Sequence, residues 1–215
     1  MLVYTATKKA FSDDVLANLI EDKILSAYKQ KTGRSTSQSE IRSWKNSLGY
    51  MNNVLTVADI PDNAGVSIEY HIPQTSKRID FVLTGQDADR KDNAIIVELK
   101  QWEKVSTTSK DGIVRTHIGG AEQDVEHPSY QAWTYATLLY DFNETVRDDD
   151  IKLRPCAYLH NCRDNDVINH SRYAEETRKA PAFLKNDVER LAAFLRQFVK
   201  YGDSGNIMYR IENGK

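Results

Sequence analysis

The sequence predicts an α/β fold with a mixed central sheet flanked by helices and with extra helices toward both ends of the chain. Apolar and polar residues alternate in short segments between residues 66 and 100, a pattern typical of neighbouring strands. Segments with helical periodicity lie before and after this region, and a further apolar run follows at 153–159. A strand, a helix and another strand in this order favour a parallel crossover, so we expect a mixed sheet.

Composition and charge restrict the class of protein. The 215 residues are 40% hydrophobic and 28% charged, which is ordinary for a globular domain with its own core. The formal net charge is −2, so nucleic acid would not be attracted by a global basic field and would need a local basic patch. The N-terminus has no basic-then-apolar signal pattern, and no apolar run approaches membrane-spanning length. We therefore expect a cytoplasmic protein without a membrane partner.

The cysteines do not indicate a disulfide framework or a zinc site. Cys156 and Cys162 are too few for a disulfide scaffold, and His160 lies between them in the chain. The spacing lacks the paired Cys-x2-Cys of common zinc sites, so zinc is not expected here.

The N-terminal region predicts a short strand at 2–4 and a first helix over about 12–31. Ser12 is a candidate N-cap, and Gly33 follows the expected end of the helix. Apolar residues at helical spacing should face the core, among them Leu16, Leu19, Ile20 and Ile24.

A second helix is expected from about Ser37 to Val57. Two interpretations of Glu40 compete. Ser37-x-x-Glu40 fits a capping box, in which the Glu side chain binds the N-terminus of its own helix. Glu40 also lies one turn before Trp44, on the same helical face, so it could instead point inward toward a metal site.

Three strand-like segments follow, at residues 66–72, 78–83 and 94–100. Their short connections favour an antiparallel meander. Asp80 lies in the second segment, and Glu98 and Lys100 share one face of the third because the side-chain period of a strand is two. One register places Asp80 beside Glu98, and a slip of one residue would separate them.

The polar segment 101–126 predicts a strand at 113–117, paired with 104–106. Arg115 and His117 could contact a phosphate backbone, although a solvated hairpin is the alternative.

A third helix should open at Pro128 and run to about Phe142, with Gln131 and Tyr135 one turn apart on one face. Later elements are expected as a strand at 153–159, a helical turn within 173–179, a helix over 187–201 and a polar tail or linker at 203–215.

Two of these segments resemble known nuclease motifs. Ile79-Asp80, followed by Glu98-Leu99-Lys100, resembles the motif of the PD-(D/E)XK nuclease superfamily, with isoleucine where the motif often has proline. Gln131-Ala-Trp-Thr-Tyr135 is similar to the Gln-x-x-x-Tyr motif that RecB-type nucleases carry on the following helix.

A wider resemblance runs from residue 1 to about residue 203. The chain is similar there to the N-terminal nuclease domain of bacterial proteins that have a Schlafen-like helicase/ATPase region downstream. It is carried by the segments Ser-Glu-Ile-Arg-Ser-Trp, Ile-Glu-Tyr-His-Ile-Pro, Lys-Arg-Ile-Asp-Phe, Glu-Leu-Lys-Gln-Trp and His-Pro-Ser-Tyr-Gln-Ala-Trp.

The resemblance implies a restriction-endonuclease-like αβββαβ core, a nuclease-like domain over residues 1–202, and hydrolysis of phosphodiester bonds, with DNA as the expected substrate. It implies a helicase/ATPase region as partner and roles in genome maintenance or phage defence. Asp80, Glu98 and the Leu99 backbone carbonyl would hold Mg²⁺ or Mn²⁺, and Glu40 would complete a second metal position. Hard oxygen ligands suit these ions, and a divalent cation relieves the repulsion between adjacent carboxylates.

The same resemblance implies roles for the neighbouring side chains. Lys100 would orient or help deprotonate the attacking water and offset negative charge. Gln131 would position Lys100, the water or a phosphate, and Tyr135 would brace that face or donate to the scissile phosphate. The residues themselves add that Lys77 and Arg78, beside Asp80, supply local positive charge for a phosphate backbone.

Two other interpretations stay open at this point. The chain could be a catalytically inactive module with the nuclease fold that binds nucleic acid or a protein partner. Alternatively, Glu98 and Lys100 could form a structural ion pair in an unrelated α/β domain.

Overall fold

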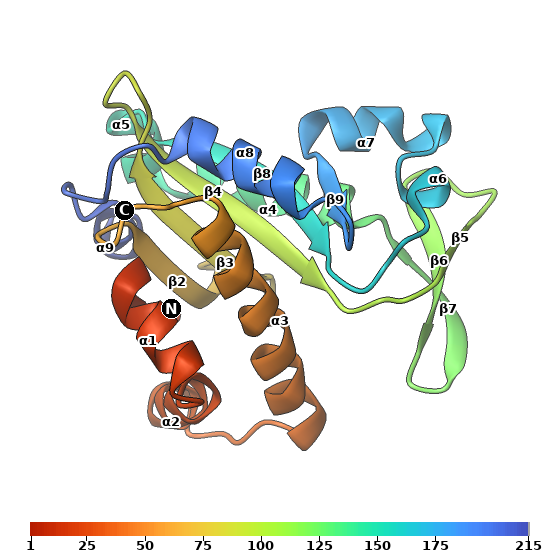
Figure 1. Cartoon of the computed structure of the whole chain (residues 1–215), viewed down its shortest axis with the longest axis horizontal. Coiled ribbons are helices and arrows are strands. Elements are labelled where there is room, and N and C mark those ends of the chain that lie inside the picture. The colour runs from red at the N-terminus through yellow and green to blue at the C-terminus, as the bar shows by residue number, and fades with distance from the viewer. Residues whose placement is uncertain (215) are drawn as a thin grey trace.

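The computed structural model describes residues 1–214, in which a six-stranded sheet separates two layers of helices (Figure 1). The strand order is β1-β2-β3-β4-β8-β9, with bounds β1 (Leu2–Thr7), β2 (Gly65–His71), β3 (Arg78–Gln86), β4 (Asp92–Lys100), β8 (Lys152–Leu159) and β9 (Ala182–Leu184). Strands β1 to β4 pair antiparallel, and β4, β8 and β9 pair parallel. The predicted meander, parallel crossover and mixed sheet are confirmed.

Helices cover both faces of this sheet, and each face has its own apolar core. One face is packed by α1 (Lys8–Leu16), α2 (Ile20–Thr32), α3 (Gln38–Val57) and α8 (Val188–Phe198). The other is packed by α4 (Pro128–Phe142), α5 (Glu144–Asp148) and α9 (Ile207–Asn213). Alternate residues of β4 serve the two cores, since Ile95 and Val97 face the first and Ile96 the second. None of the helices in the described part of the chain has the length and apolar character needed to cross a membrane.

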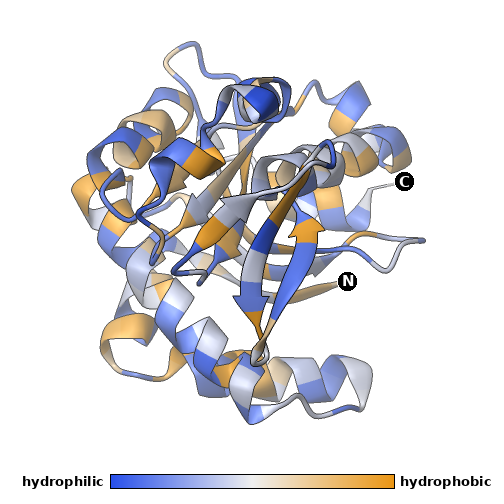
Figure 2. Cartoon of the chain, turned by 90° about the vertical axis from the view of Figure 1, so that its right-hand side faces the viewer, coloured by the Kyte–Doolittle hydropathy of each residue, from blue (hydrophilic) through white to orange (hydrophobic). Residues whose placement is uncertain are grey.

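A smaller three-stranded antiparallel sheet extends from the end of β4. Its order is β5-β6-β7, with bounds β5 (Val105–Thr107), β6 (Ile113–Ile118) and β7 (Ala121–Glu126). The predicted pairing of two strands in this segment is confirmed, whereas β7 was not predicted because its residues are almost all polar and exposed. Figure 2 shows this sheet projecting toward the viewer from the rest of the molecule.

The first predicted helix is wrong in its bounds, because the chain forms two helices that are separated at Asn18. Asn18 has a left-handed backbone, with φ of 55°, which interrupts helical hydrogen bonding. Thr7, rather than Ser12, caps α1 by accepting a hydrogen bond from the Ala10 N–H. The break turns Leu16 and Leu19 outward, with exposed fractions of 75% and 46%, so they do not face the core as expected.

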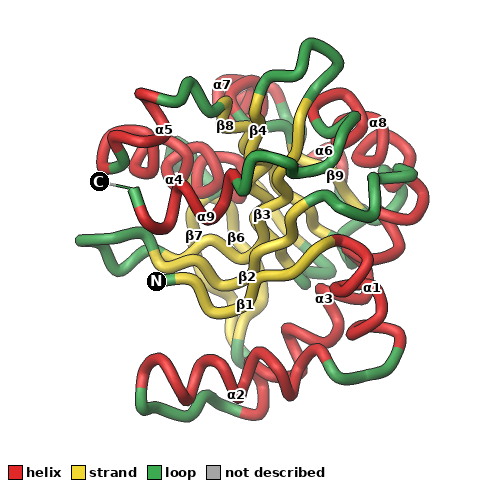
Figure 3. Tube along the Cα trace, turned by 90° about the vertical axis from the view of Figure 1, so that its left-hand side faces the viewer, coloured by secondary structure: helices red, strands yellow, loops and turns green. Residues whose placement is uncertain are grey.

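The predicted polar tail is also wrong, because residues 207–213 form α9. Ile207, Met208 and Ile211 are buried in the core beneath the sheet. The Leu2 N–H donates to Glu212 Oε1 at 2.9 Å, so the C-terminal part of α9 lies close to the start of β1 (Figure 3). Three buried apolar residues on a seven-residue helix are hard to detect in a segment that is otherwise polar.

Smaller elements complete the chain. The helical turn expected near 173–179 is confirmed as α7 (Ala174–Lys179), after a 3₁₀ turn at Ser171–Tyr173. The short α5, α6 (Asn165–Ile168) and β9 were not predicted. Helix α8 ends before the predicted residue 201, because the Lys200 and Tyr201 N–H groups donate to Gln86 O at the end of β3.

Candidate functional site

A cavity of about 570 Å³ lies at the end of β4, between the N-terminal half of α3 and the first turns of α4. Side chains from β2 and β3 complete its walls. The residues that line it include Asp80, Glu98, Leu99, Lys100, Gln131, Tyr135, Glu40, Lys77 and Arg78. The sheet and two helices therefore bring into one cavity nine of the positions that the sequence singled out.

The cavity forms where β3 and β4 separate. Their paired residues run from Gln86–Asp92 to Phe81–Val97, which is the register that puts Asp80 next to Glu98. Beyond the Phe81–Val97 pair, the Leu99 N–H donates to Asp80 Oδ2 at 3.0 Å. The Asp80 side chain therefore takes the place of a backbone carbonyl as the acceptor from β4. Asp80 and Glu98 thus lie where the pairing of β3 and β4 ends. The register of these two strands is the one that allows the two carboxylates to share a site.

Glu98 is a buried carboxylate with an incomplete set of partners. Its side chain is 2% exposed, and Oε1 lies 2.6 Å from Lys100 Nζ. Oε2 is buried without a hydrogen-bond partner among the described residues. Burial, followed by the negative charge of Asp80, raises the pKa of Glu98 to about 8, although Lys100 opposes this shift. An ionised Glu98 would gain from a further positive group in the cavity.

Asp80 and Lys100 share this electrostatic environment. Burial raises the pKa of Asp80, while Lys100 and the Leu99 N–H favour its ionised form. Burial disfavours the charged form of Lys100, but the carboxylates of Glu98 and Asp80 outweigh it, so the pKa of Lys100 is raised. Lys100 is therefore an ammonium at neutral pH, suited to donate hydrogen bonds and offset negative charge rather than to accept a proton.

The predicted pair on the third helix is present. Gln131 Nε2 donates to the Tyr135 hydroxyl at 2.5 Å, one turn along α4. The buried Tyr135 has a pKa raised to about 12, first by burial and then by the charge of Glu98. Its hydroxyl consequently keeps its proton at neutral pH, and because it accepts from Gln131 it can donate that proton into the cavity.

Glu40 fulfils only half of the expected capping box. The Ser37 side chain does accept from the Glu40 N–H, at 3.2 Å. The Glu40 carboxylate turns away from the helix start and accepts from Arg78 Nη1 at 2.7 Å and from the Thr36 hydroxyl. Glu40 therefore lines the cavity with its carboxylate bound to Arg78. Its use as a metal ligand stays a prediction.

Glu69 is the site residue that sequence reasoning did not select. Its carboxylate is 2% exposed, accepts from Trp44 Nε1 at 2.7 Å and lies 2.7 Å from Arg78 Nε. The backbone at Glu69 is left-handed, with φ of 59°, a costly conformation for a residue within a strand. Burial raises the pKa of Glu69 to about 7, although Arg78 opposes this shift. The available signal was a carboxylate in an apolar, alternating strand, on the same face as His71.

The candidate nucleic-acid contacts are not equivalent. Lys77 and Arg78 both line the cavity, and Arg78 is also paired with Glu69 and Glu40. Arg115 pairs with Asp124 across the small sheet at 2.7 Å and lines neither this cavity nor the one beside it, within the described residues. His117 lines that second cavity.

The cysteines and His160 do not come together as a cluster. Cys156 and Cys162 are buried in separate apolar cores. His160 stacks on Tyr50, with ring centroids 4.3 Å apart, and its Nε2 lies 3.0 Å from the Ser47 hydroxyl.

The residues present fit a hard divalent cation, with a limited donor set. Within residues 1–214, no group of three or more His, Cys, Asp or Glu side chains is arranged to hold a metal ion. Two carboxylates are available, Asp80 and Glu98, and the second has an oxygen without a partner. An ion bound there would need its remaining ligands from backbone oxygen, water or substrate, which suits Mg²⁺ because it retains several waters in proteins.

Comparison with known proteins found no match to this chain among protein-family models, curated proteins or solved structures.

Proposed function

We propose that the chain is a metal-dependent nuclease that hydrolyses phosphodiester bonds, with DNA as its expected substrate. The observation that carries the proposal is the meeting of Asp80, Glu98 and Lys100 where two antiparallel strands separate inside a cavity. The order α3-β2-β3-β4-α4-β8, interrupted by the small sheet β5–β7 and the short α5, supports the proposal, because the sequence resemblance implies an αβββαβ core.

Asp80 and Glu98 would hold Mg²⁺ or Mn²⁺, together with the Leu99 carbonyl. When bound, such an ion supplies charge stabilisation and activates water for attack on phosphorus. The Lys100 ammonium donates to a non-bridging phosphate oxygen or orients the water, which offsets negative charge as the bond forms. The protonated Tyr135 hydroxyl, fixed by Gln131, donates to the phosphate from the α4 side.

The direct test is cleavage of plasmid and linear DNA in Mg²⁺ or Mn²⁺ by the wild type, Asp80→Ala and Lys100→Ala. We expect both variants to lose cleavage by about 10² or more, the usual size of one acid–base or electrostatic contribution. Asp87→Ala is the matched control, because this aspartate lies in the loop at the other end of β4. Equal cleavage by the wild type and both site variants would mean a contaminating nuclease and would remove the proposal.

Thermal unfolding with and without metal separates this enzyme from an inactive module with the same fold. A metal concentration about 100 times Kd should stabilise the wild type by roughly 2.7 kcal/mol, and Asp80→Asn should abolish the shift. Binding of DNA without a metal-dependent shift and without cleavage would favour the inactive module.

A further inference from the structure

A second cavity, of about 670 Å³, adjoins the first. The two share Ser43, Leu99 and Lys100 as lining residues, so the surface is continuous from one to the other. The second cavity is lined by Ser43 of α3, by Thr116 to Ile118 of β6, and by residues 101–104, where the chain leaves β4. Gln101 Nε2 donates to Ser43 O at 3.0 Å, which connects the segment after β4 to α3.

Trp102 is the principal aromatic surface of this second cavity. It is half-buried, and part of its ring packs on the apolar cluster that contains Val105 and Leu159. Lys100 Nζ lies 5.3 Å from the centre of the indole ring and 2.6 Å from Glu98 Oε1. The side chains Glu98, Lys100 and Trp102 therefore form a row of contacts from the carboxylate site into the second cavity.

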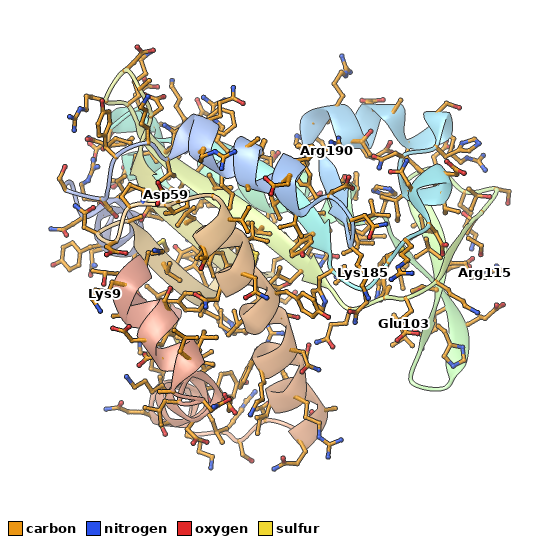
Figure 4. All side chains as sticks on the ribbon, in the orientation of Figure 1. Lys9, Asp59, Glu103, Arg115, Lys185 and Arg190 are labelled. Atoms are coloured by element: carbon orange, nitrogen blue, oxygen red, sulfur yellow. The ribbon has the colours of Figure 1, made fainter. Side chains whose placement is uncertain are left out.

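The chemistry of this cavity suits a nucleotide. Its volume is within the range that holds a drug-sized molecule, the size class of a mononucleotide. Lysines outnumber carboxylates among its lining residues, with Lys100 and Lys104 against Glu103, and His117 adds a second ring. Figure 4 labels Glu103 at this side of the molecule, between the end of β4 and the small sheet.

We infer that this second cavity holds the nucleotide next to the scissile phosphate, and that its unpaired base stacks on Trp102. The inference rests on the proposed function and specifies its substrate as single-stranded or locally unpaired nucleic acid. In an intact duplex the faces of each base are covered by its neighbours, so a half-buried indole beside the site can be reached only by a base that has left the stack.

The test is direct binding, measured by fluorescence anisotropy in EDTA so that no cleavage occurs. The probes are a labelled oligothymidylate of about 12 nucleotides, within the span of known single-strand sites, and a duplex of equal length. Trp102→Leu keeps the apolar packing but removes the π-face, and Trp102→Phe keeps a ring. We expect Trp102→Leu to weaken oligothymidylate binding by roughly 5- to 140-fold, the equivalent of one stacked base. Trp102→Phe should stay within a few-fold of the wild type.

Trp133→Leu provides a matched control. Trp133 also has a lysine over its ring, Lys179 at 4.0 Å, but it lines a different cavity on α4. This variant should bind both probes as the wild type does. The inference is overturned if the wild type does not bind oligothymidylate, or if Trp102→Leu binds it as tightly as the wild type or loses duplex binding to the same extent. Because these readouts are independent of cleavage, the inference and the proposed nuclease activity can fail separately.

Discussion

The two ends of strand β4 both carry charged side chains, but they differ in how deeply their carboxylates are buried and in how many hydrogen-bond partners these carboxylates have. At the Asp92 end, Arg210 of α9 pairs with Asp92 and with Asp149, the latter at 2.6 Å. The Asn93 amide at the same end donates to Asp87 and to the Lys91 carbonyl. Each carboxylate there has a cation or a hydrogen-bond donor and partial access to solvent.

At the Lys100 end, the cavity collects four carboxylates and three cationic side chains: Glu40, Glu69, Asp80 and Glu98 with Lys77, Arg78 and Lys100. Glu98 and Glu69 are both 2% exposed, and burial raises the pKa of each. Charge at a strand end is therefore not itself a sign of a functional site. The distinguishing features are the burial of the carboxylates and the oxygen of Glu98 that has no partner among the described residues.

The largest effect expected from this comparison is on activity, at Lys100. Lys100→Met should lower DNA cleavage by about 10²–10⁴, because the ammonium that offsets charge in the cavity is lost. The measurement is initial cleavage rate in Mg²⁺ with saturating DNA. Lys100→Arg keeps the positive charge beside Glu98 and should retain more activity than Lys100→Met. An unchanged rate in Lys100→Met would assign the pair with Glu98 to structure alone.

The second effect concerns stability and pH at Glu69. The pKa of this carboxyl is raised from 4.5 to about 7 in the folded protein, so folding favours its protonated form. The stability it contributes is present below about pH 4.5 and is lost as the pH rises through 7. Relative to Glu69→Gln, the wild type should lose on the order of 3 kcal/mol of unfolding free energy between pH 4 and pH 8.

Urea unfolding across this pH range measures the difference between the two proteins. The glutamine side chain of Glu69→Gln retains an oxygen that accepts from Trp44 Nε1, and Arg78 retains Glu40, so the comparison mainly isolates the charge. Buried histidines such as His127, whose pKa is lowered by burial, contribute equally to both proteins and cancel. Parallel stability curves for the two proteins would show that the Glu69 charge is not coupled to folding.

Site residues could be predicted from the sequence where local periodicity places them, and could not where contacts between distant parts of the chain place them. Asp80, Glu98 and Lys100 were predictable because strand periodicity sets their faces, and Gln131 and Tyr135 because helical spacing sets theirs. The register between β3 and β4 was not predictable, because the observed register and a slip of one residue would both bury apolar residues. Glu69 was missed because its partners, Trp44 and Arg78, come from separate elements, and because a left-handed residue inside a strand has no sequence signal unless it is glycine.

The fold shows the same division. The α3, β2–β4, α4 and β8 succession was predicted from local periodicity, whereas α9 depends on burial against a sheet formed by residues far away in the chain. The sequence consequently predicts a polar tail for the segment that contains Arg210. In the structure, Arg210 forms ion pairs with two aspartates at the Asp92 end of β4.

The smallest effect is expected at Arg210, and it tests the Asp92 end of β4. Arg210→Met keeps the length of the apolar stem, but Asp92 and Asp149 lose their cation. Because the Arg210 side chain is 29% exposed and both partners reach solvent, the cost should be about 1 kcal/mol or less in urea unfolding. DNA cleavage should be unchanged, since the variant lies at the opposite end of β4 from Lys100. A loss of cleavage without a loss of stability would mean that the two ends of the strand are coupled, and that the Asp92 end takes part in function rather than only in folding.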